Sequence, residues 1–182
     1  MRKEIILSGS GGQGLILAGI VLAEAALLAG LQAVQTQSYG PEARGGASRS
    51  EVIIGDEEID YPKVERADLL LAMNQEACDK FTGAVKETGL AVVDSTYVSE
   101  LPAVAFRVVS LPITQATKER LGKAIVANMA ALGALVYFLE EVPLALAEQA
   151  IAQRVPRGTE EINRQAFRLG RELAEEYILA GR

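Results

Sequence analysis

Short apolar runs bounded by glycine or polar residues alternate with longer Ala- and Leu-rich segments along the chain. Residues 4–8 form such a run and end in glycines, and residues 15–29 form an apolar segment that Gly30 closes, which predicts a strand, a turn and a helix. Similar runs predict strands over residues 33–37, 48–54, 68–73, 90–94 and 104–111, and a helix over 75–88. This alternation indicates an α/β, Rossmann-like fold with a mostly parallel sheet flanked by helices.

An antiparallel element and a helical C-terminal third complete the predicted fold. Gly55 and Asp56 offer turn chemistry between the strand 48–54 and a short run at 58–61, which predicts a hairpin. From Pro112 the pattern becomes helical to about residue 141, and Thr159 is a suitable N-cap for the last helix. The apolar face of that helix is Ile162, Ala166, Leu169, Leu173 and Tyr177. No repeat or change of composition divides the chain, so we expect residues 1–182 to form a single domain.

The composition removes several classes of catalytic site. The 182 residues include no histidine and one cysteine, Cys78. A Ser-His or Cys-His nucleophile pair is therefore excluded, and an iron–sulfur cluster would need about four thiolates. We expect no metal site on this chain, and we expect Cys78 to be a small core residue.

The charge and hydropathy of the chain limit the kinds of partner that it is expected to bind. The chain has 24 acidic and 18 basic side chains, a net charge of -6, which argues against nucleic acid and anionic membranes. The longest apolar stretch, residues 125–139, is shorter than the roughly 18 residues of a membrane span and contains Asn128. It predicts a buried helix with Asn128 as a hydrogen-bonded core or interface amide. The first residues lack the features of a signal peptide, so we expect a cytoplasmic protein.

A glycine-rich turn, "LSGSGGQGLILAG" at residues 7–19, is the first candidate site. It has the spacing G-x-G-x-x-G at the junction of a predicted strand and helix, where glycines let backbone N–H groups approach a ligand at the positive end of the helix. The candidate ligand-binding residues are Gly9, Ser10, Gly11, Gly12, Gln13 and Gly14.

Three interpretations of this turn remain open: an anion or phosphate site, a structural turn, and a dinucleotide site. A dinucleotide fold needs a carboxylate at the end of the second strand, but "VQTQSYG" has none before Glu42. A P-loop is excluded because Gly14 is followed by Leu15 and Ile16 where Lys and Ser or Thr are required.

A second loop, "SYGPEARGGAS" at residues 38–48, brings unlike side chains together. In a doubly wound sheet it would leave the second strand beside the glycine turn, where such folds bind ligands. Arg44 could pair with a phosphate or carboxylate, or with Glu42 or a partner chain. The candidate partner contacts are Tyr39, Glu42, Gly45 and Gly46. The alternative is a surface loop with a solvated ion pair.

Four segments in order along the chain resemble the gamma subunit of 2-oxoacid:ferredoxin oxidoreductases. They are "GSGGQG" at 9–14, "QSYGPEARGGASRSEVII" at 37–54, "DLLLAMNQEA" at 68–77 and "NMAALGAL" at 128–135. The form Y-G-P-E-A-R-G-G is most similar to the 2-oxoglutarate branch, with pyruvate or another 2-oxoacid as alternatives.

This resemblance implies a subunit of a multi-chain enzyme that decarboxylates a 2-oxoacid with coenzyme A and passes electrons to ferredoxin. In that family thiamine diphosphate, magnesium and 4Fe-4S clusters lie on the alpha, beta and delta chains, so this chain would be inactive alone. Its own role would be to support assembly, and the turn with Arg44 could bind coenzyme A.

Two other hypotheses stand beside this one. The glycine turn alone is compatible with a stand-alone nucleotide-binding module of the Rossmann class. The apolar helix around Asn128 and Gly133 could form a self-interface, which would make an isolated chain a homodimer.

Overall fold

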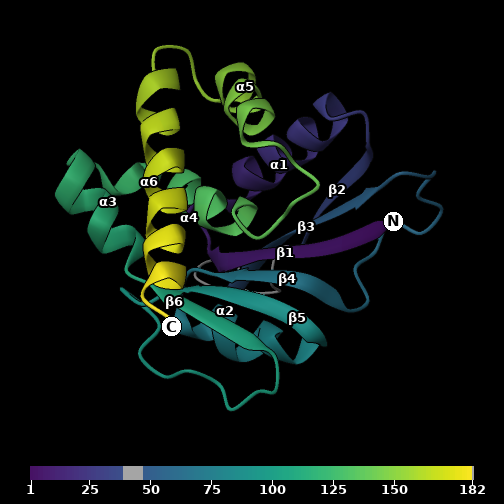
Figure 1. Cartoon of the computed structure of the whole chain (residues 1–182), viewed down its shortest axis with the longest axis horizontal. Coiled ribbons are helices and arrows are strands. Elements are labelled where there is room, and N and C mark those ends of the chain that lie inside the picture. The colour runs from purple at the N-terminus through teal and green to yellow at the C-terminus, as the bar shows by residue number, and fades with distance from the viewer. Residues whose placement is uncertain (39–46, 182) are drawn as a thin grey trace.

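A six-stranded sheet carries the fold in the computed structural model, which describes residues 1–38 and 47–181 (Figure 1). The strand order is β2-β3-β1-β4-β5-β6. The strands are β1 (Arg2–Ser10), β2 (Gln32–Ser38), β3 (Ala47–Gly55), β4 (Ala67–Ala72), β5 (Val85–Asp94) and β6 (Arg107–Leu111). The helices are α1 (Leu15–Leu28), α2 (Gln75–Phe81), α3 (Ile113–Leu121), α4 (Ala127–Val136), α5 (Leu144–Arg154) and α6 (Glu160–Leu179).

The sheet is mostly parallel, as predicted, with its antiparallel part on one side. Strands β1, β4, β5 and β6 run parallel to one another. Strand β3 runs antiparallel to both of its neighbours, β1 and β2. The prediction of antiparallel character is confirmed, but its placement at 48–54 and 58–61 is wrong. Residues 58–61 form no strand, and β3 pairs instead with the two earlier strands.

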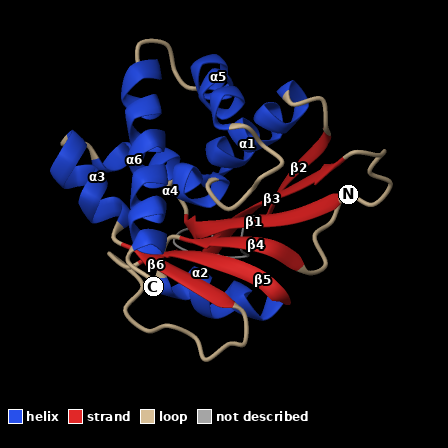
Figure 2. Cartoon of the chain, viewed as in Figure 1, coloured by secondary structure: helices blue, strands red, loops and turns tan. Residues whose placement is uncertain are grey.

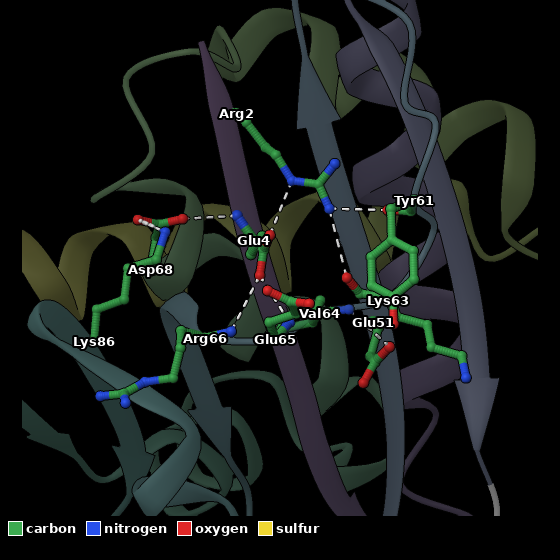
Figure 3. Close-up of polar contacts among 10 residues, drawn as sticks. All are labelled: Arg2, Glu4, Glu51, Tyr61, Lys63, Val64, Glu65, Arg66, Asp68 and Lys86. Carbon is green, nitrogen blue, oxygen red and sulfur yellow. Dashed lines mark hydrogen bonds and ion pairs between the residues drawn. The ribbon is translucent and has the colours of Figure 1, made fainter.

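Residues 58–61 do not pair with β3 because β1 and β2 occupy both of its edges. The connection 56–66 crosses the sheet, and Glu4 on β1 and Glu51 on β3 accept its backbone N–H groups (Figure 3). One oxygen of Glu4 lies 2.9 Å from the nitrogen of Glu65 and 3.2 Å from that of Arg66. Donors of the connection are thus satisfied by side chains rather than by a second strand.

Arginine side chains neutralise these carboxylates. Arg2 Nε lies 2.9 Å from Glu4, and the same guanidinium donates to the carbonyl of Tyr61 (Figure 3). Arg49 lies 2.8 Å from the second oxygen of Glu51. Both carboxylates are less than a tenth exposed, so pairing offsets the cost of burying them.

Helices cover both faces of the sheet (Figure 2). The larger core lies between one face and the helices α1, α3, α4, α5 and α6, whereas α2 covers the other face. Cys78 on α2 is fully buried in the smaller core, as predicted, and burial raises the pKa of its thiol.

Two predicted helices are shorter in the structure. The helix predicted over 75–88 ends at Phe81, and after a 3-10 turn the chain becomes β5 at Val85, which pairs with Ala67 and is buried. Sheet pairing therefore overrides the local helical pattern. The helix predicted from Pro112 to about residue 141 is broken at Gly122, which has φ +70° and ends α3.

The two predicted helix starts are formed in different ways. Asn74 Oδ1 accepts a hydrogen bond from the backbone nitrogen of Ala77 at 2.8 Å, so it caps α2 as predicted. Thr159 precedes α6 as predicted, but its hydroxyl donates to the carbonyl of Pro156 and accepts from the Asn163 amide. It therefore does not cap the helix with its side chain.

Helix α4 is entirely buried, which confirms the prediction of a buried helix for residues 127–136 and removes this helix as a self-interface, whereas Ile125 at the start of the predicted segment is exposed. Helix α4 crosses α6 at two glycines. A Cβ on Gly133 would lie 1.9 Å from the carbonyl oxygen of Phe167, and one on Gly170 would lie 1.7 Å from that of Ala130. Among the described residues, no helix is long and apolar enough to span a membrane.

We expect Gly133→Ala to lower the free energy of unfolding by about 3 kcal/mol, because the added methyl group must push two helix backbones apart. Chemical denaturation of the purified chain measures this change. Gly83→Ala is the matched control, since its Cβ would meet no atom within 4 Å, and its effect should stay within about 0.5 kcal/mol. Equal stabilities of the two variants would contradict the close crossing.

Candidate functional site

The glycine turn joins the end of β1 to the start of α1, and Gln13 closes it. The backbone nitrogen of Ser10 donates to Gln13 Oε1 at 2.7 Å, and Gln13 Nε2 donates to the carbonyl of Met73 at 3.4 Å. Met73 follows β4, and its backbone nitrogen donates to the carbonyl of Ser8. Gln13 thus ties the turn to the carboxyl ends of two parallel strands, and its side chain serves the turn itself.

Three of the glycines are required by the chain's own packing or conformation. A Cβ on Gly9 would lie 2.3 Å from Gln13 Oε1, so this glycine makes room for the closing amide. Gly12 has φ +86° and Gly14 has φ +75°, both in the left-handed region. A Cβ on Gly14 would also lie 2.5 Å from Asn128 Nδ2.

Gly11 differs from these three. It is exposed, its φ is not in the left-handed region, and a Cβ there would meet no atom within 4 Å. Among the described residues, nothing in the fold requires glycine at this position. A ligand or another chain that approaches the turn closely would require it.

A cavity of about 240 Å³ lies beside the turn. Its lining comes from the starts of three helices: Gln13 before α1, Thr114 in α3, and Asn128 in α4. The lining residues are Gly12, Gln13, Met73, Tyr97, Thr114, Ala124, Ile125, Ala127 and Asn128. None of them carries a charge, and Ile125 is 84% exposed at the rim.

Two of the helix starts lack an acidic neighbour. Neither α1 nor α4 has an acidic residue in its first turn, and at neither does the residue before the helix cap it with its side chain. The helix dipole therefore places positive potential at these two helix starts, where no carboxylate of the first turn compensates it. An anionic group is the ligand chemistry that this arrangement favours.

Asn128 connects these two helix starts. Its Nδ2 donates to the carbonyl of Gly14 at 3.1 Å, and its Oδ1 accepts from the backbone nitrogen of Met129 at 2.9 Å. Both ends of this buried amide are satisfied, which confirms the prediction of a hydrogen-bonded core amide.

Asp94 fixes the opposite wall. This fully buried carboxylate accepts from the Thr114 hydroxyl at 2.6 Å and from the backbone nitrogens of Thr96 and Thr114. It ends β5 and satisfies the start of α3, where Pro112 provides no side-chain cap. It also fixes the turn that carries Tyr97, a half-exposed ring at the cavity.

The sequence predicts the glycine turn as a site but does not predict the other residues that line the cavity. Tyr97, Thr114 and Ile125 stand in no motif, and only the topology brings them to the turn. A strand-ending Asp94 was the available signal, since a carboxylate there is suited to hold a following turn. With no histidine and no charged group in the lining, the site is suited to binding rather than to acid–base catalysis.

The residues predicted in the second loop, Tyr39, Glu42, Arg44, Gly45 and Gly46, lie outside the described residues. The ends of that loop are described. Ala47 pairs with Ser10 across β3 and β1, and Ser38 pairs with Arg49 across β2 and β3. The two ends of the loop therefore lie at the same end of the strands as the glycine turn.

Comparisons with known proteins agree along nearly the whole chain. Residues 4–173 match the model of the pyruvate ferredoxin/flavodoxin oxidoreductase family. The 2-oxoglutarate synthase subunit KorC of Methanocaldococcus jannaschii is 50% identical, over 97% of this chain and 96% of that protein.

Solved structures share the fold. The crystal structure of the gamma subunit of a keto/oxoacid ferredoxin oxidoreductase from Geobacter sulfurreducens has a TM-score of 0.90 and 48% identity, over 97% of this chain and 98% of that one. The 2-oxoglutarate:ferredoxin oxidoreductase of Magnetococcus marinus, described with 2-oxoglutarate, coenzyme A and succinyl-CoA bound, has a TM-score of 0.85. It is 24% identical, over 96% of this chain and 31% of that chain, and shows the fold alone.

The sheet order, the glycine turn and these relatives lead to one assignment. The chain belongs to the pyruvate ferredoxin/flavodoxin oxidoreductase family and is a subunit of a multi-chain 2-oxoacid:ferredoxin oxidoreductase.

Proposed function

We propose that this chain is the gamma subunit of a 2-oxoglutarate:ferredoxin oxidoreductase and that its glycine turn binds a phosphate group of coenzyme A. The observation that carries the second part is the start of α1, which opens on a cavity without a cap or an acidic residue. Phosphate oxygens accept hydrogen bonds from backbone N–H groups at such helix starts. The gamma assignment and the 2-oxoacid rest on the relatives that carry those names.

The cavity is large enough for part of a coenzyme A molecule but too small to enclose all of it. Its volume of about 240 Å³ is below that of sites that enclose a drug-sized ligand, which run to roughly 300–1,000 Å³. Its lining also lacks a lysine or arginine. A phosphate here would therefore be held by backbone amides, with Arg44 or a partner chain as the source of positive charge.

Other chains supply the redox chemistry in this proposal. One cysteine and no histidine leave this chain without the ligands of a 4Fe-4S cluster. Thiamine diphosphate, magnesium and the clusters would lie on alpha, beta and delta chains, with ferredoxin as the electron acceptor. The part of this chain would be to bind coenzyme A and to support assembly.

The stand-alone dinucleotide module is less well supported. In a dinucleotide fold the strand beside β1 ends in the carboxylate that holds the ribose. Here the neighbour of β1 on that side is β3, which runs antiparallel and places Ala47 next to Ser10. Strand β2 lies one position further out and ends at Ser38 without a carboxylate.

We expect Gly11→Ala to raise the KM for coenzyme A about tenfold in the assembled enzyme, because the added methyl group would hold the phosphate away from a backbone N–H and so weaken one hydrogen bond to a charged group. Its free energy of unfolding should not change, because the added methyl group meets no atom of this chain. Steady-state kinetics and chemical denaturation measure the two quantities.

Two variants control for general effects at the turn. Gly9→Ala should lower stability, because its Cβ would displace the Gln13 side chain. Gly83→Ala, which is equally open but distant from the turn, should leave the KM unchanged. An unchanged KM for Gly11→Ala would contradict a coenzyme A phosphate that lies close to Gly11.

Arg44→Ala separates ligand binding from assembly in the second loop. A raised KM for coenzyme A with intact assembly is expected, because the variant removes a guanidinium that can pair with phosphate. Weaker assembly with an unchanged KM would make Arg44 a partner contact instead. Gel filtration of the complex and steady-state kinetics distinguish the two outcomes.

Purification from the native source tests the subunit assignment and the substrate together. We expect the chain to be recovered with alpha, beta and delta chains, and the complex to have a higher kcat/KM for 2-oxoglutarate than for pyruvate. A free chain, or tight binding of a dinucleotide by the isolated chain in calorimetry, would favour the stand-alone module.

A further inference from the structure

Helix α1 is apolar on its outward side as well as on its core side. Of its 14 residues, only Glu24 is charged or polar, and that carboxylate is bound by Arg154 of α5. Ile16, Ile20, Ala23 and Leu27 are partly or largely exposed. Their spacing places them on one face of the helix, which we call the α1 stripe. A helix that is apolar all round is normally buried.

Strand β2 forms an open edge of the sheet. Within the described part of the chain it pairs with β3 over all seven of its residues, and it ends the strand order. Its sequence, QAVQTQS, contains no charge, proline or glycine. Edge strands normally carry such residues to prevent pairing with another chain.

The other edge of the sheet is protected, which makes the contrast informative. Strand β6 has five residues, begins with Arg107 and is followed by Pro112. The carbonyl of Val108 on β6 also accepts from the Tyr177 hydroxyl at 3.4 Å. Short length, charge and a nearby proline are the usual devices that block an edge.

The α1 stripe and the β2 edge belong to neighbouring elements at one side of the sheet. Helix α1 packs on β2 and β3, and its last turn leads through residues 29–31 into β2 (Figure 1). We propose that a second copy of this chain pairs on this surface, with β2 antiparallel to its equivalent and the two α1 stripes in contact. A two-fold axis perpendicular to the sheet makes both pairings at once.

A second copy fits this surface because both parts are self-complementary. Each chain has a net charge of -6, so an uncharged surface lets two copies approach with little repulsion. In antiparallel self-pairing centred on Gln35, every residue of β2 faces an uncharged residue. The Gln35 amide donates to Ser50 Oγ at 2.9 Å and to the carbonyl of Thr36 at 3.3 Å, so this side chain is held within its own chain.

This arrangement keeps the glycine turns accessible. Antiparallel pairing points the carboxyl ends of the two β1 strands in opposite directions, so the two cavities lie at opposite ends of the dimer. Other chains of the enzyme could then contact each turn separately. The dimer does not depend on coenzyme A binding, and its test is independent of that proposal.

Sedimentation equilibrium of the full chain tests the dimer. We expect the mass of two chains for the natural sequence and of one chain for Ile20→Lys and for Leu27→Lys, because each places a charge in the α1 stripe. Leu179→Lys is the control, since Leu179 is 81% exposed at the far end of α6, and it should remain dimeric. Circular dichroism confirms that each variant is folded.

Hydrogen exchange tests the strand pairing. Alternate backbone amides of residues 32–38 should exchange slowly in the dimer and quickly in the Ile20→Lys variant. A monomeric natural chain, or a dimer that survives both stripe variants, would overturn the proposal. Protection of these amides only after the other chains are added would assign the surface to one of those chains instead.

Discussion

The hydrogen bond from Asn128 to the carbonyl of Gly14 ties together two helix starts that lie 114 residues apart in the sequence. It positions α4 against α1 at the cavity, and the absence of a Cβ on Gly14 lets the amide approach. The close crossing of α4 and α6 supports this contact from behind, because it holds α4 deep in the larger core. The geometry of the candidate site therefore depends on helix packing as much as on the glycine turn.

The elements with strong local signals could be predicted from the sequence. The strand–turn–helix at the N-terminus, the buried apolar helix and the cap at Asn74 follow from periodicity, glycine and side-chain chemistry. The wrong predictions of secondary structure lie where contacts between residues far apart in the sequence decide the structure. Val85 joins β5 because it pairs with Ala67, and residues 58–61 stay out of the sheet because both edges of β3 are already paired.

The same distinction holds for the site. The glycine turn is a contiguous motif, so its residues were found, whereas Tyr97, Thr114 and Ile125 come from separate segments that only the folded sheet brings together. What the sequence excluded was equally informative. A chain without histidine and with one buried cysteine lacks the ligands of a 4Fe-4S cluster, which fits a subunit of a multi-chain enzyme.

The paired glycines between α4 and α6 have a consequence for how this protein can change during evolution. Neither Gly133 nor Gly170 can be enlarged alone without separating the helices, and separation would draw Asn128 away from Gly14. A substitution in the helical layer would thus impair the proposed coenzyme A binding while every residue of the cavity stays the same. Loss of function in this subunit can therefore originate in a part of the chain that no ligand touches.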